Sequence, residues 1–289
     1  MLAEALRSVA LQTIDMSAVE IVVVNDGGPD VTPEALAAAG DVDVRVHRLS
    51  SPRGPAVARN AGIDDARGDY IAFLDDDDVY LPAHFETLLR AMDSDRVEAA
   101  YGNCVISSER VDPALPLTGG QRQLDMPFSA EFLNVCPHIS IHSPLYRTFG
   151  ARGVRFDTEL GGLSDWDLQL QIVNDLRYRL RYVDVVTGVY HRVPRVRSVT
   201  GQIAQDPATQ AKFVRHVWRI WKKWPAPGER VGRYRRWLME GVLEGVKRAP
   251  AGPLPLSYYD RCVRLLAAAW HGQAPEEGLV DRMAAAATP

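Results

Sequence analysis

The sequence predicts an α/β protein in which a doubly wound, mostly parallel sheet is followed by a helical region. Apolar runs at residues 20–25 and 70–74 have the length and composition of buried strands. Helical patterns alternate with the strands in a β-α-β-α-β order, which is typical of a parallel sheet covered on both faces. From about Pro207 the patterns are helical only. We therefore expect one domain over residues 1–205 and a helical region over residues 206–289.

The composition excludes several classes of protein. Of the 289 residues, 46 % are hydrophobic and 24 % are charged, as in ordinary globular proteins, so extensive disorder is not expected. A formal net charge of −4 argues against a general nucleic-acid-binding protein. The three cysteines are far apart and odd in number, which argues against a disulfide framework or a cysteine zinc site and favours a reducing cytosol. No apolar run is long enough to cross a bilayer.

Turn residues and periodicity place the elements of the first half of the chain. Thr32 provides a helix N-cap and Pro33 a first helical position, and Gly68 stops the helix before the second apolar run. In chain order we expect helix 1–12, strand 20–25, helix 33–40, strand 42–49, helix 56–66 and strand 70–74.

The strand at Tyr70–Leu74 ends at four consecutive carboxylates, Asp75 to Asp78. In open α/β sheets, ligands bind at the carboxyl ends of the strands, which is where this acidic run lies. Adjacent negative charges repel one another, and a hard divalent cation held together with substrate phosphates is the usual compensation. The alternative is an acidic turn that only caps the next helix. We favour the cation site because a buried strand precedes the run.

The elements after the acidic run follow from weaker patterns. In chain order we expect helix 82–93, strand 97–106, strand 138–146, a helix beginning at residue 164 and strand 178–190. The loop over residues 107–127 is rich in Gly and Pro, and we expect it to form a mobile lid over the acidic site.

A family resemblance is carried by four segments: EIVVVNDGGPD (20–30), RGPAVARNAGIDDARGDYIAFLDDDDVYLP (53–82), LSDWDLQLQI (163–172) and YHRVPRVRSVT (190–200). In their order and spacing the chain resembles the family 2 glycosyltransferases over roughly residues 1–200. These are inverting enzymes of the GT-A fold that use nucleotide-sugar donors. The resemblance therefore implies a GT-A-type sheet and a divalent metal cofactor, Mn²⁺ or Mg²⁺.

The resemblance implies donor-binding roles for residues at two strand ends and on one helix. Asp26 matches the acidic residue that contacts the nucleotide base, although Asn25 stands where the family usually has a second acid. Arg59 and Asn60 match the Ala-Arg-Asn segment near the diphosphate.

The acidic run matches the DxD motif of the family. Asp75 and Asp77 match its outer acids, and Asp77 is the expected direct metal ligand, with Asp75 beside it. Asp76 is expected to face the ribose. His191 matches a late position that contacts the metal or the diphosphate, and a purely structural role is an equal alternative. Three later residues would either meet phosphate or form a solvated basic loop: Arg192, Arg195 and Arg197.

Asp165 matches the catalytic base of the family, which takes a proton from the acceptor hydroxyl. Ser164 stands where the family usually has Glu, so a neighbouring acceptor contact stays open. The alternative is that Ser164 and Asp165 only cap the following helix, with Asp167 in its first turn.

The largest departure from the family lies at the start of the chain. In the family, a strand in the middle of the sheet precedes the helix that here occupies residues 1–12. We therefore expect the sequence to be N-terminally incomplete, with an upstream extension of roughly ten to twenty residues in the natural protein. Beside residues 20–25 there should be an open place, or one filled by another segment.

Residues 212–248 hold eleven Lys or Arg, three Glu and four of the six tryptophans. Apolar residues at helical spacing form a stripe there: Phe213, Val214, Val217, Trp218, Trp221 and Trp224. Such a helix could lie on an anionic membrane and bring an enzyme to a lipid-linked acceptor. The alternative, commoner in soluble helices, is that the stripe packs on the catalytic domain or on another subunit.

The function implied by the resemblance is transfer of a sugar from a nucleoside-diphosphate donor, expected to be a UDP-sugar, by an inverting, metal-dependent glycosyltransferase. The acceptor is an unidentified hydroxyl on a sugar, a lipid-linked or another molecule, and synthesis of a cell-surface (cell-envelope) polysaccharide is the expected setting. We expect a cytoplasmic protein without a nucleic-acid partner, and a homo-oligomer or contact with the inner face of the membrane through residues 212–248 remains open. A non-catalytic nucleotide-binding scaffold and, less favoured, a sugar nucleotidyltransferase are the alternatives.

Overall fold

The structure is a computed structural model that describes residues 1–93, 96–123, 126–160, 162–192, 207–248 and 258–287, without the side chains of residues 121 and 207–213. The chain forms two compact units. Unit 1 comprises Met1–Phe128 and Ile139–Pro194, and unit 2 comprises Ser129–His138 and Arg195–Pro289. No sequence pattern had indicated that the short segment Ser129–His138 joins the helical region.

The described strands all lie in unit 1: β1 (Glu20–Asn25), β2 (Asp43–Arg48), β3 (Tyr70–Ala72), β4 (Val79–Tyr80), β5 (Ala99–Ser107), β6 (Gln121–Arg122), β7 (Pro144–Arg147) and β8 (Leu180–His191). Its described helices are α1 (Leu2–Ala10), α2 (Pro33–Ala37), α3 (Pro55–Asp65), α4 (His84–Ala91) and α6 (Ser164–Leu170), with short helical turns at Met16–Ala18, Gly150–Arg152 and Gln171–Asp175. Thr32 caps α2 as expected, because its hydroxyl oxygen accepts a hydrogen bond from the Ala35 N–H at 3.2 Å.

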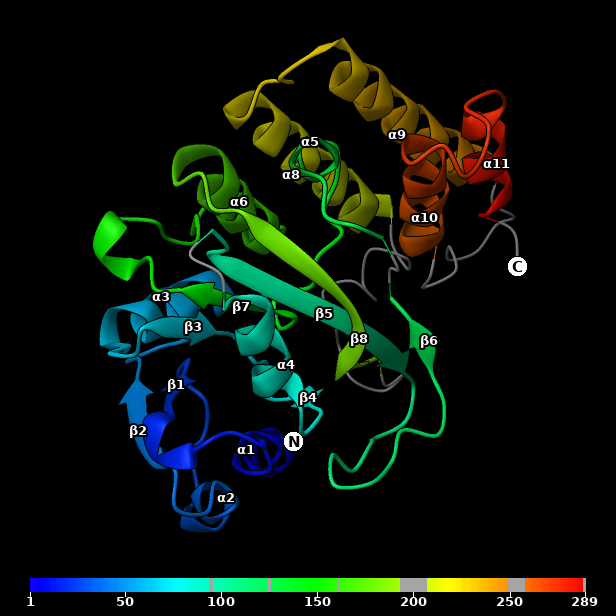
Figure 1. Ribbon diagram of the computed structural model, residues 1–289. Helices are drawn as coiled ribbons and strands as arrows, with labels where there is room; N and C mark the ends of the chain where they lie inside the picture. The colour runs from blue at the N-terminus through cyan, green and yellow to red at the C-terminus, as the bar shows by residue number, and fades with distance from the viewer. Residues whose placement is uncertain (94–95, 124–125, 161, 193–206, 249–257, 288–289) are drawn as a thin grey trace. The chain divides into compact units, whose positions relative to one another are not determined.

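The strands form two sheets (Figure 1). β1 pairs with β2 in one sheet, and the other has the order β3-β7-β5-β8-β4 with β6 beside β5. The longest ladders, β1–β2 and β5–β8, are parallel, whereas four shorter ladders are antiparallel: β3–β7, β5–β7, β4–β8 and β5–β6. The α/β class is confirmed, but the sheet is less uniformly parallel than expected.

β1 has one strand partner, β2, among the described residues. All six residues of β1 are half-buried, so it is not the fully buried strand that its apolar sequence predicts. The Glu20 side chain instead ties β1 to the chain just before β3, since its Oε1 accepts hydrogen bonds from the N–H groups of Arg67 (2.6 Å) and Gly68 (3.0 Å). Both the open place expected beside β1 and the upstream extension stay predictions.

α1 and α4 pack on the larger sheet and fix the segment that follows the acidic run. Tyr80, Phe85 and Leu88 belong to a buried apolar cluster that also includes Val9 of α1. The Gln12 amide joins the two helices, because its Nε2 donates to the Leu81 carbonyl oxygen (2.9 Å) and its Oε1 accepts from the Phe85 N–H (3.0 Å). β4 and the start of α4 are thereby held in place, and with them one end of the acidic loop.

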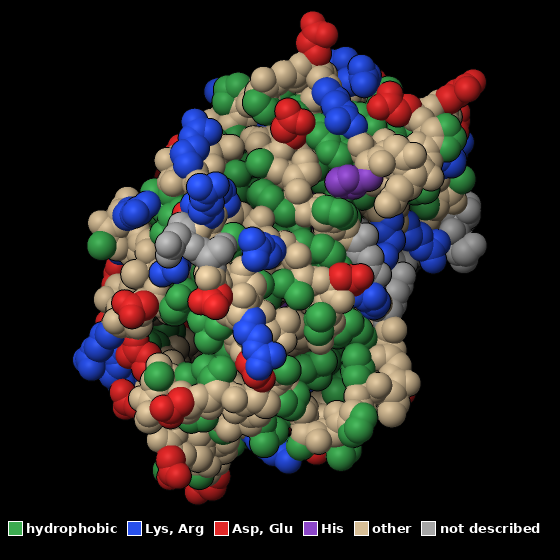
Figure 2. All heavy atoms as spheres, in the orientation of Figure 1, with side chains coloured by type: hydrophobic (Ala, Val, Ile, Leu, Met, Phe, Trp, Pro, Cys, Tyr) green, Lys and Arg blue, Asp and Glu red, His purple; other side chains and the backbone are tan. Residues whose placement is uncertain are grey.

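The described helices of unit 2 are α5 (Ala130–Leu133), α8 (Pro207–Lys223), α9 (Glu229–Arg248), α10 (Tyr258–Trp270) and α11 (Leu279–Ala285). Val217, Ile220 and Trp221 of α8 are buried, and the Trp221 indole N–H donates to the Val135 carbonyl oxygen at 3.1 Å. Of the predicted apolar stripe, Val217 and Trp221 are therefore packed inside the protein, Val214 and Trp224 are partly buried, and Trp218 is 57 % exposed. In Figure 2, Lys and Arg side chains are spread over the visible face among apolar and acidic side chains.

None of the helices in the described part of the chain combines the length and the apolar character that a membrane span requires.

Candidate functional site

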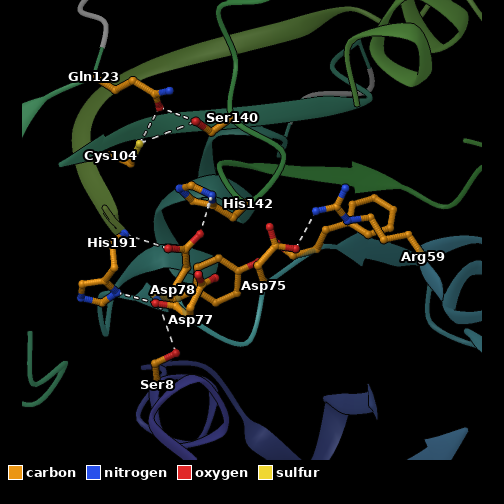
Figure 3. A network of polar contacts seen from close by, with 12 residues as sticks. Ser8, Arg59, Asp75, Asp77, Asp78, Cys104, Gln123, Ser140, His142 and His191 are labelled. Carbon is orange, nitrogen blue, oxygen red and sulfur yellow. Dashed lines mark hydrogen bonds and ion pairs between the residues drawn. The ribbon is translucent and has the colours of Figure 1, made fainter. Parts of the chain in front are cut away.

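The acidic run lies in the loop that joins β3 and β4, the two outer strands of the larger sheet (Figure 3). Asp75, Asp77 and Asp78 each offer one carboxylate oxygen, and these oxygens all lie within 4.8 Å of one another. Oxygen ligands from carboxylates are those that Mg²⁺ and Mn²⁺ prefer. The donor set therefore fits a hard divalent cation, which supports the alternative favoured from the sequence over a simple helix cap.

Asp78 is the buried member of this cluster, with 1 % of its surface exposed. Its Oδ1 accepts a hydrogen bond from the His191 N–H (2.8 Å), and its Oδ2 lies 3.3 Å from Nδ1 of the buried His142 without a hydrogen bond. Burial raises the pKa of Asp78 to about 8, against the effect of the His191 N–H and with a further contribution from the charge of Asp77. A bound cation would stabilise the negative charge of this buried carboxylate and contact its Oδ2, which accepts no hydrogen bond.

Asp77 is half-buried, and Asp76 between it and Asp75 is exposed. Burial raises the pKa of Asp77, and the charges of Asp75 and Asp76 add to that rise. The structure therefore brings Asp75 and Asp77 together as predicted, with Asp78 as an additional member of the group. Sequence reasoning gave Asp78 no role, although its place directly before the buried pair Val79–Tyr80 was an available signal.

Arg59 links the acidic loop to α3 (Figure 3). Its Nη2 donates to Asp75 Oδ1 at 2.6 Å, and its guanidinium lies 5.5 Å from the centre of the Phe156 ring. Burial alone would lower the pKa of Arg59, but the carboxylates of Asp75, Asp165 and Asp78 outweigh that effect and raise it. Arg59 is thus a permanent cation held between the acidic loop and Asp165.

Asn60 is occupied by the loop that carries Phe156. Its amide Nδ2 donates to the Phe156 carbonyl oxygen (2.9 Å) and its Oδ1 accepts from the Phe156 N–H (2.8 Å). In this arrangement Asn60 positions Phe156 beneath the Arg59 guanidinium. A direct contact of Asn60 with the diphosphate stays a prediction.

Asp165 lies in the first turn of α6. The helix begins at Ser164 as expected, but its N-cap is Leu163, and no side chain caps it. The Asp165 carboxylate accepts only from the adjacent Trp166 N–H (2.9 Å) among the hydrogen bonds found for it, so the helix-cap alternative is not supported. Burial raises the pKa of Asp165, while nearby Arg59 opposes that rise. A carboxylate with a raised pKa beside a cation suits a proton acceptor.

Leu163 has a positive φ of 64°, a conformation that bulky residues rarely adopt. Strained backbone of this kind clusters at functional sites, where the surrounding structure maintains it. Here the left-handed conformation of Leu163 turns the chain immediately before Asp165.

Asp26 follows β1 and organises the loop before α3. Its two carboxylate oxygens accept hydrogen bonds from the N–H groups of Arg53 and Gly54, both at 2.7 Å. Gly54 has φ 91° and is the N-cap of α3, so only glycine is unstrained at this position. The contact of Asp26 with a nucleotide base stays a prediction.

His191 ends β8 beside the cluster, with both ring nitrogens engaged by backbone groups. Its Nε2 accepts from the Val111 N–H (3.1 Å), so its Nδ1 donates to the Asp77 carbonyl oxygen (2.6 Å). Burial lowers its pKa, which favours this neutral form. The group of three close carboxylates does not include His191, and its role as a metal ligand stays a prediction.

The loop after β5 reaches over the acidic run. Arg110 Nη1 donates to the Asp77 carbonyl oxygen (3.1 Å) and to Glu4 of α1 (3.2 Å), and Asp112 pairs with Arg7 of α1 (2.9 Å). The position of the loop agrees with the expected lid, whereas its motion stays a prediction. Of the basic residues after His191, Arg192 lies 5.1 Å from the Tyr190 ring, and Arg195 and Arg197 are outside the described residues.

Comparison with known proteins gives the class to which this fold and site belong. The family model described as "Glycosyl transferase family 2" matches residues 1–151, about half of the chain. The chain belongs to glycosyl transferase family 2, and it is a glycosyltransferase of the GT-A fold.

Individual relatives agree with this assignment. The chain is 29 % identical over 192 residues to an uncharacterized glycosyltransferase, YwdF of Bacillus subtilis (strain 168), covering 65 % of this chain and 68 % of that protein. It is similar in fold to S. aureus TarS in complex with UDP, with TM-score 0.57, 14 % identity and coverage of 96 % and 89 %. A mannosyltransferase of Pyrobaculum calidifontis in complex with GDP-Man and Mn²⁺ has TM-score 0.52, 18 % identity and coverage of 99 % and 81 %.

Proposed function

We propose that the chain transfers a sugar, with inversion at the anomeric carbon, from a nucleoside-diphosphate donor to an acceptor hydroxyl in a divalent-metal-dependent reaction. The observation that carries this proposal is the arrangement of Arg59, which binds Asp75 of the acidic cluster and also acts electrostatically on Asp165. The proposed site for the leaving diphosphate and the proposed base for the acceptor would thereby both lie beside Arg59 in unit 1.

The chemistry requires a base on the side of the sugar opposite the leaving group. The acceptor oxygen forms a bond to the anomeric carbon as the bond from that carbon to the diphosphate oxygen breaks, and the nucleoside diphosphate departs with the electron pair. Asp165 takes the acceptor proton, because burial raises its pKa and it lies outside the three-carboxylate group that would hold the cation. Attack opposite the leaving group accounts for inversion.

The diphosphate end of the donor would be bound at the acidic cluster. Asp75, Asp77 and Asp78 would hold a divalent cation, and the cation supplies Lewis-acid stabilisation of the leaving diphosphate when bound. Arg59 adds a fixed positive charge on the same side. Asp26, which holds the loop before α3, is the proposed contact for the base of the nucleotide.

UDP is the proposed nucleotide, supported by the TarS complexes with UDP and UDP-GlcNAc, although the GDP-Man complex of the mannosyltransferase has a similar fold. Mn²⁺ is the metal to try first, because that mannosyltransferase complex contains it. The acceptor is proposed only as a hydroxyl group, with a cell-surface polysaccharide as the expected product.

The test is calorimetric titration of the chain with UDP, in the presence of Mn²⁺ and again with EDTA. Asp77→Asn should lose most of the gain in affinity that Mn²⁺ produces, by about tenfold or more, since it removes one charged ligand. Asp69→Asn is the matched control, because it makes the same change at an exposed acid outside the three-oxygen group. Equal Mn²⁺-dependent affinity in wild type and Asp77→Asn would contradict the proposed metal site.

A further inference from the structure

The exposed face of α8 in unit 2 carries a concentrated positive charge. The exposed residues among the described side chains of α8 recur at helical spacing and make up this face: Arg215, Trp218, Arg219, Lys222 and Lys223. They lie within about 140° of the helix circumference, at 100° per residue. The sequence of α8 contains no Asp or Glu. One exposed tryptophan thus stands among four cations of the same helix.

Packing explains why this face points outward. The opposite side of α8 buries Val217, Ile220 and Trp221, so the apolar residues that could insert into a bilayer are already used inside the protein. Trp218 remains 57 % exposed and makes an edge-on contact with the buried Trp221 ring, with centroids 5.5 Å apart. A partner of this face must bind both the exposed indole ring and the positive charges around it.

We propose that the α8 face binds the surface of an anionic membrane, by adsorption of its cations to lipid headgroups with Trp218 as the interfacial anchor. Basic residues next to an anionic leaflet are attracted to it, and tryptophan prefers the headgroup region of a bilayer. The attraction is local, because the chain as a whole has a formal charge of −4 and would otherwise be repelled. This mode differs from insertion of an amphipathic helix, since the apolar side of α8 stays within the protein.

Single-stranded nucleic acid is the other polyanion that pairs cations with an aromatic ring. It is disfavoured because stacking proteins use several rings along a basic groove, whereas the exposed α8 face presents Trp218 alone. The membrane assignment does not depend on the reaction proposed above, so the two can fail separately.

The experiment is co-sedimentation of the full chain with lipid vesicles. Vesicles of phosphatidylcholine with about one-third phosphatidylglycerol should bind the protein, and pure phosphatidylcholine vesicles should not. Raising NaCl from about 0.05 to about 0.5 M should release it, because salt screens exposed charges. Arg215→Gln/Lys222→Gln should weaken binding about 25-fold, or about fivefold for each cation removed. Adding Trp218→Ala to this pair should weaken vesicle binding further.

The matched control is Arg67→Gln/Arg90→Gln, which removes two exposed cations from unit 1. It should bind anionic vesicles as the wild type does, and all variants should retain the wild-type melting temperature. Equal losses in the α8 and control pairs would overturn the proposal, as would absence of binding to anionic vesicles. Binding of a single-stranded oligonucleotide without vesicle binding, abolished by the α8 pair, would assign the face to nucleic acid instead.

Discussion

Asp78 shows how burial changes the properties of one residue in a row of four identical ones. Asp76 is exposed, whereas Asp78 is almost completely buried between the His191 backbone and the His142 ring. The same side chain therefore has its pKa raised to about 8 at one position only. Burial therefore differs along the acidic run, and a bound cation would stabilise the charge of the innermost carboxylate, Asp78, most strongly.

Replacement of Asp165 by Asn tests the proposed base. Asp165→Asn keeps the size of the side chain and removes proton acceptance, so sugar transfer should fall by about 10²–10⁴-fold while UDP binding with Mn²⁺ is retained. Slow hydrolysis of UDP-sugars provides a readout without a known acceptor, and calorimetry provides the binding control. Wild-type hydrolysis in this variant would leave Asp165 without a catalytic role.

His84 gives a prediction for stability against pH. This fully buried ring is stacked on Tyr80, with centroids 3.9 Å apart, and burial, with His142 nearby, lowers its pKa from 6.5 to about 3. Below pH 6.5 the unfolded chain binds a proton that the folded chain excludes, so stability should fall as the pH drops from about 6.5 towards 3. The loss attributable to His84 is on the order of 4 kcal/mol across that window.

Chemical denaturation at several pH values measures this loss. His84→Phe preserves an aromatic ring beside Tyr80 and cannot be protonated, so its free energy of unfolding should depend less on pH below 6.5. The same slope in wild type and variant would show that His84 does not titrate on unfolding.

At the scale of elements, α9 contains glycines that pack closely against other helices and one that does not. A Cβ added at Gly245 would overlap the hydroxyl of Tyr258 in α10, and one at Gly241 would lie 2.6 Å from Met283 in α11. At Gly232 an added Cβ would have no neighbour closer than 3.8 Å. Close approach of α10 and α11 therefore depends on two of the three glycines.

Alanine substitution separates these roles within the one helix. Gly245→Ala should destabilise the protein by about 1–3 kcal/mol, because the Tyr258 ring is buried and must move. Gly232→Ala is the matched control and should stabilise it by up to about 1 kcal/mol through helix propensity. Denaturant unfolding measures both values, and equal effects of the two substitutions would contradict the packing of α9 against α10.

For the whole molecule, the division into two units predicts which segments a bound donor protects from hydrogen exchange. The acidic cluster, Arg59 and Asp165 all belong to unit 1, whereas α9, α10 and α11 belong to unit 2. UDP with Mn²⁺ should therefore slow hydrogen exchange in the segments around β3, β4 and α3, and leave α9–α11 unchanged, because binding stabilises the states that contain the intact site. Asp77→Asn should lose this protection. Uniform protection of both units would show that they are coupled.

Local signals in the sequence account for most of the elements. Thr32 and Pro33 mark the start of α2, and the start of α6 at Ser164 and the bounds of β1 were predicted to the residue. Caps, turns and periodicity act over a few residues, so they can be recognised without the rest of the chain. The strand expected over 138–146 is shorter in the structure, where β7 spans Pro144–Arg147. Strand formation depends on partners far away in the sequence.

By itself, the sequence determined the α/β class, the family and the positions of the acidic loop, Arg59 and Asp165. Only the tertiary structure decided that β3 pairs with β7, that Asp78 joins Asp75 and Asp77, that Asn60 holds Phe156, and that α8 turns Trp218 and its cations outward. The physical reason is that motifs and periodicity are local properties of the chain. Strand partners, desolvation and the direction in which a side chain is buried depend instead on residues that meet only after folding.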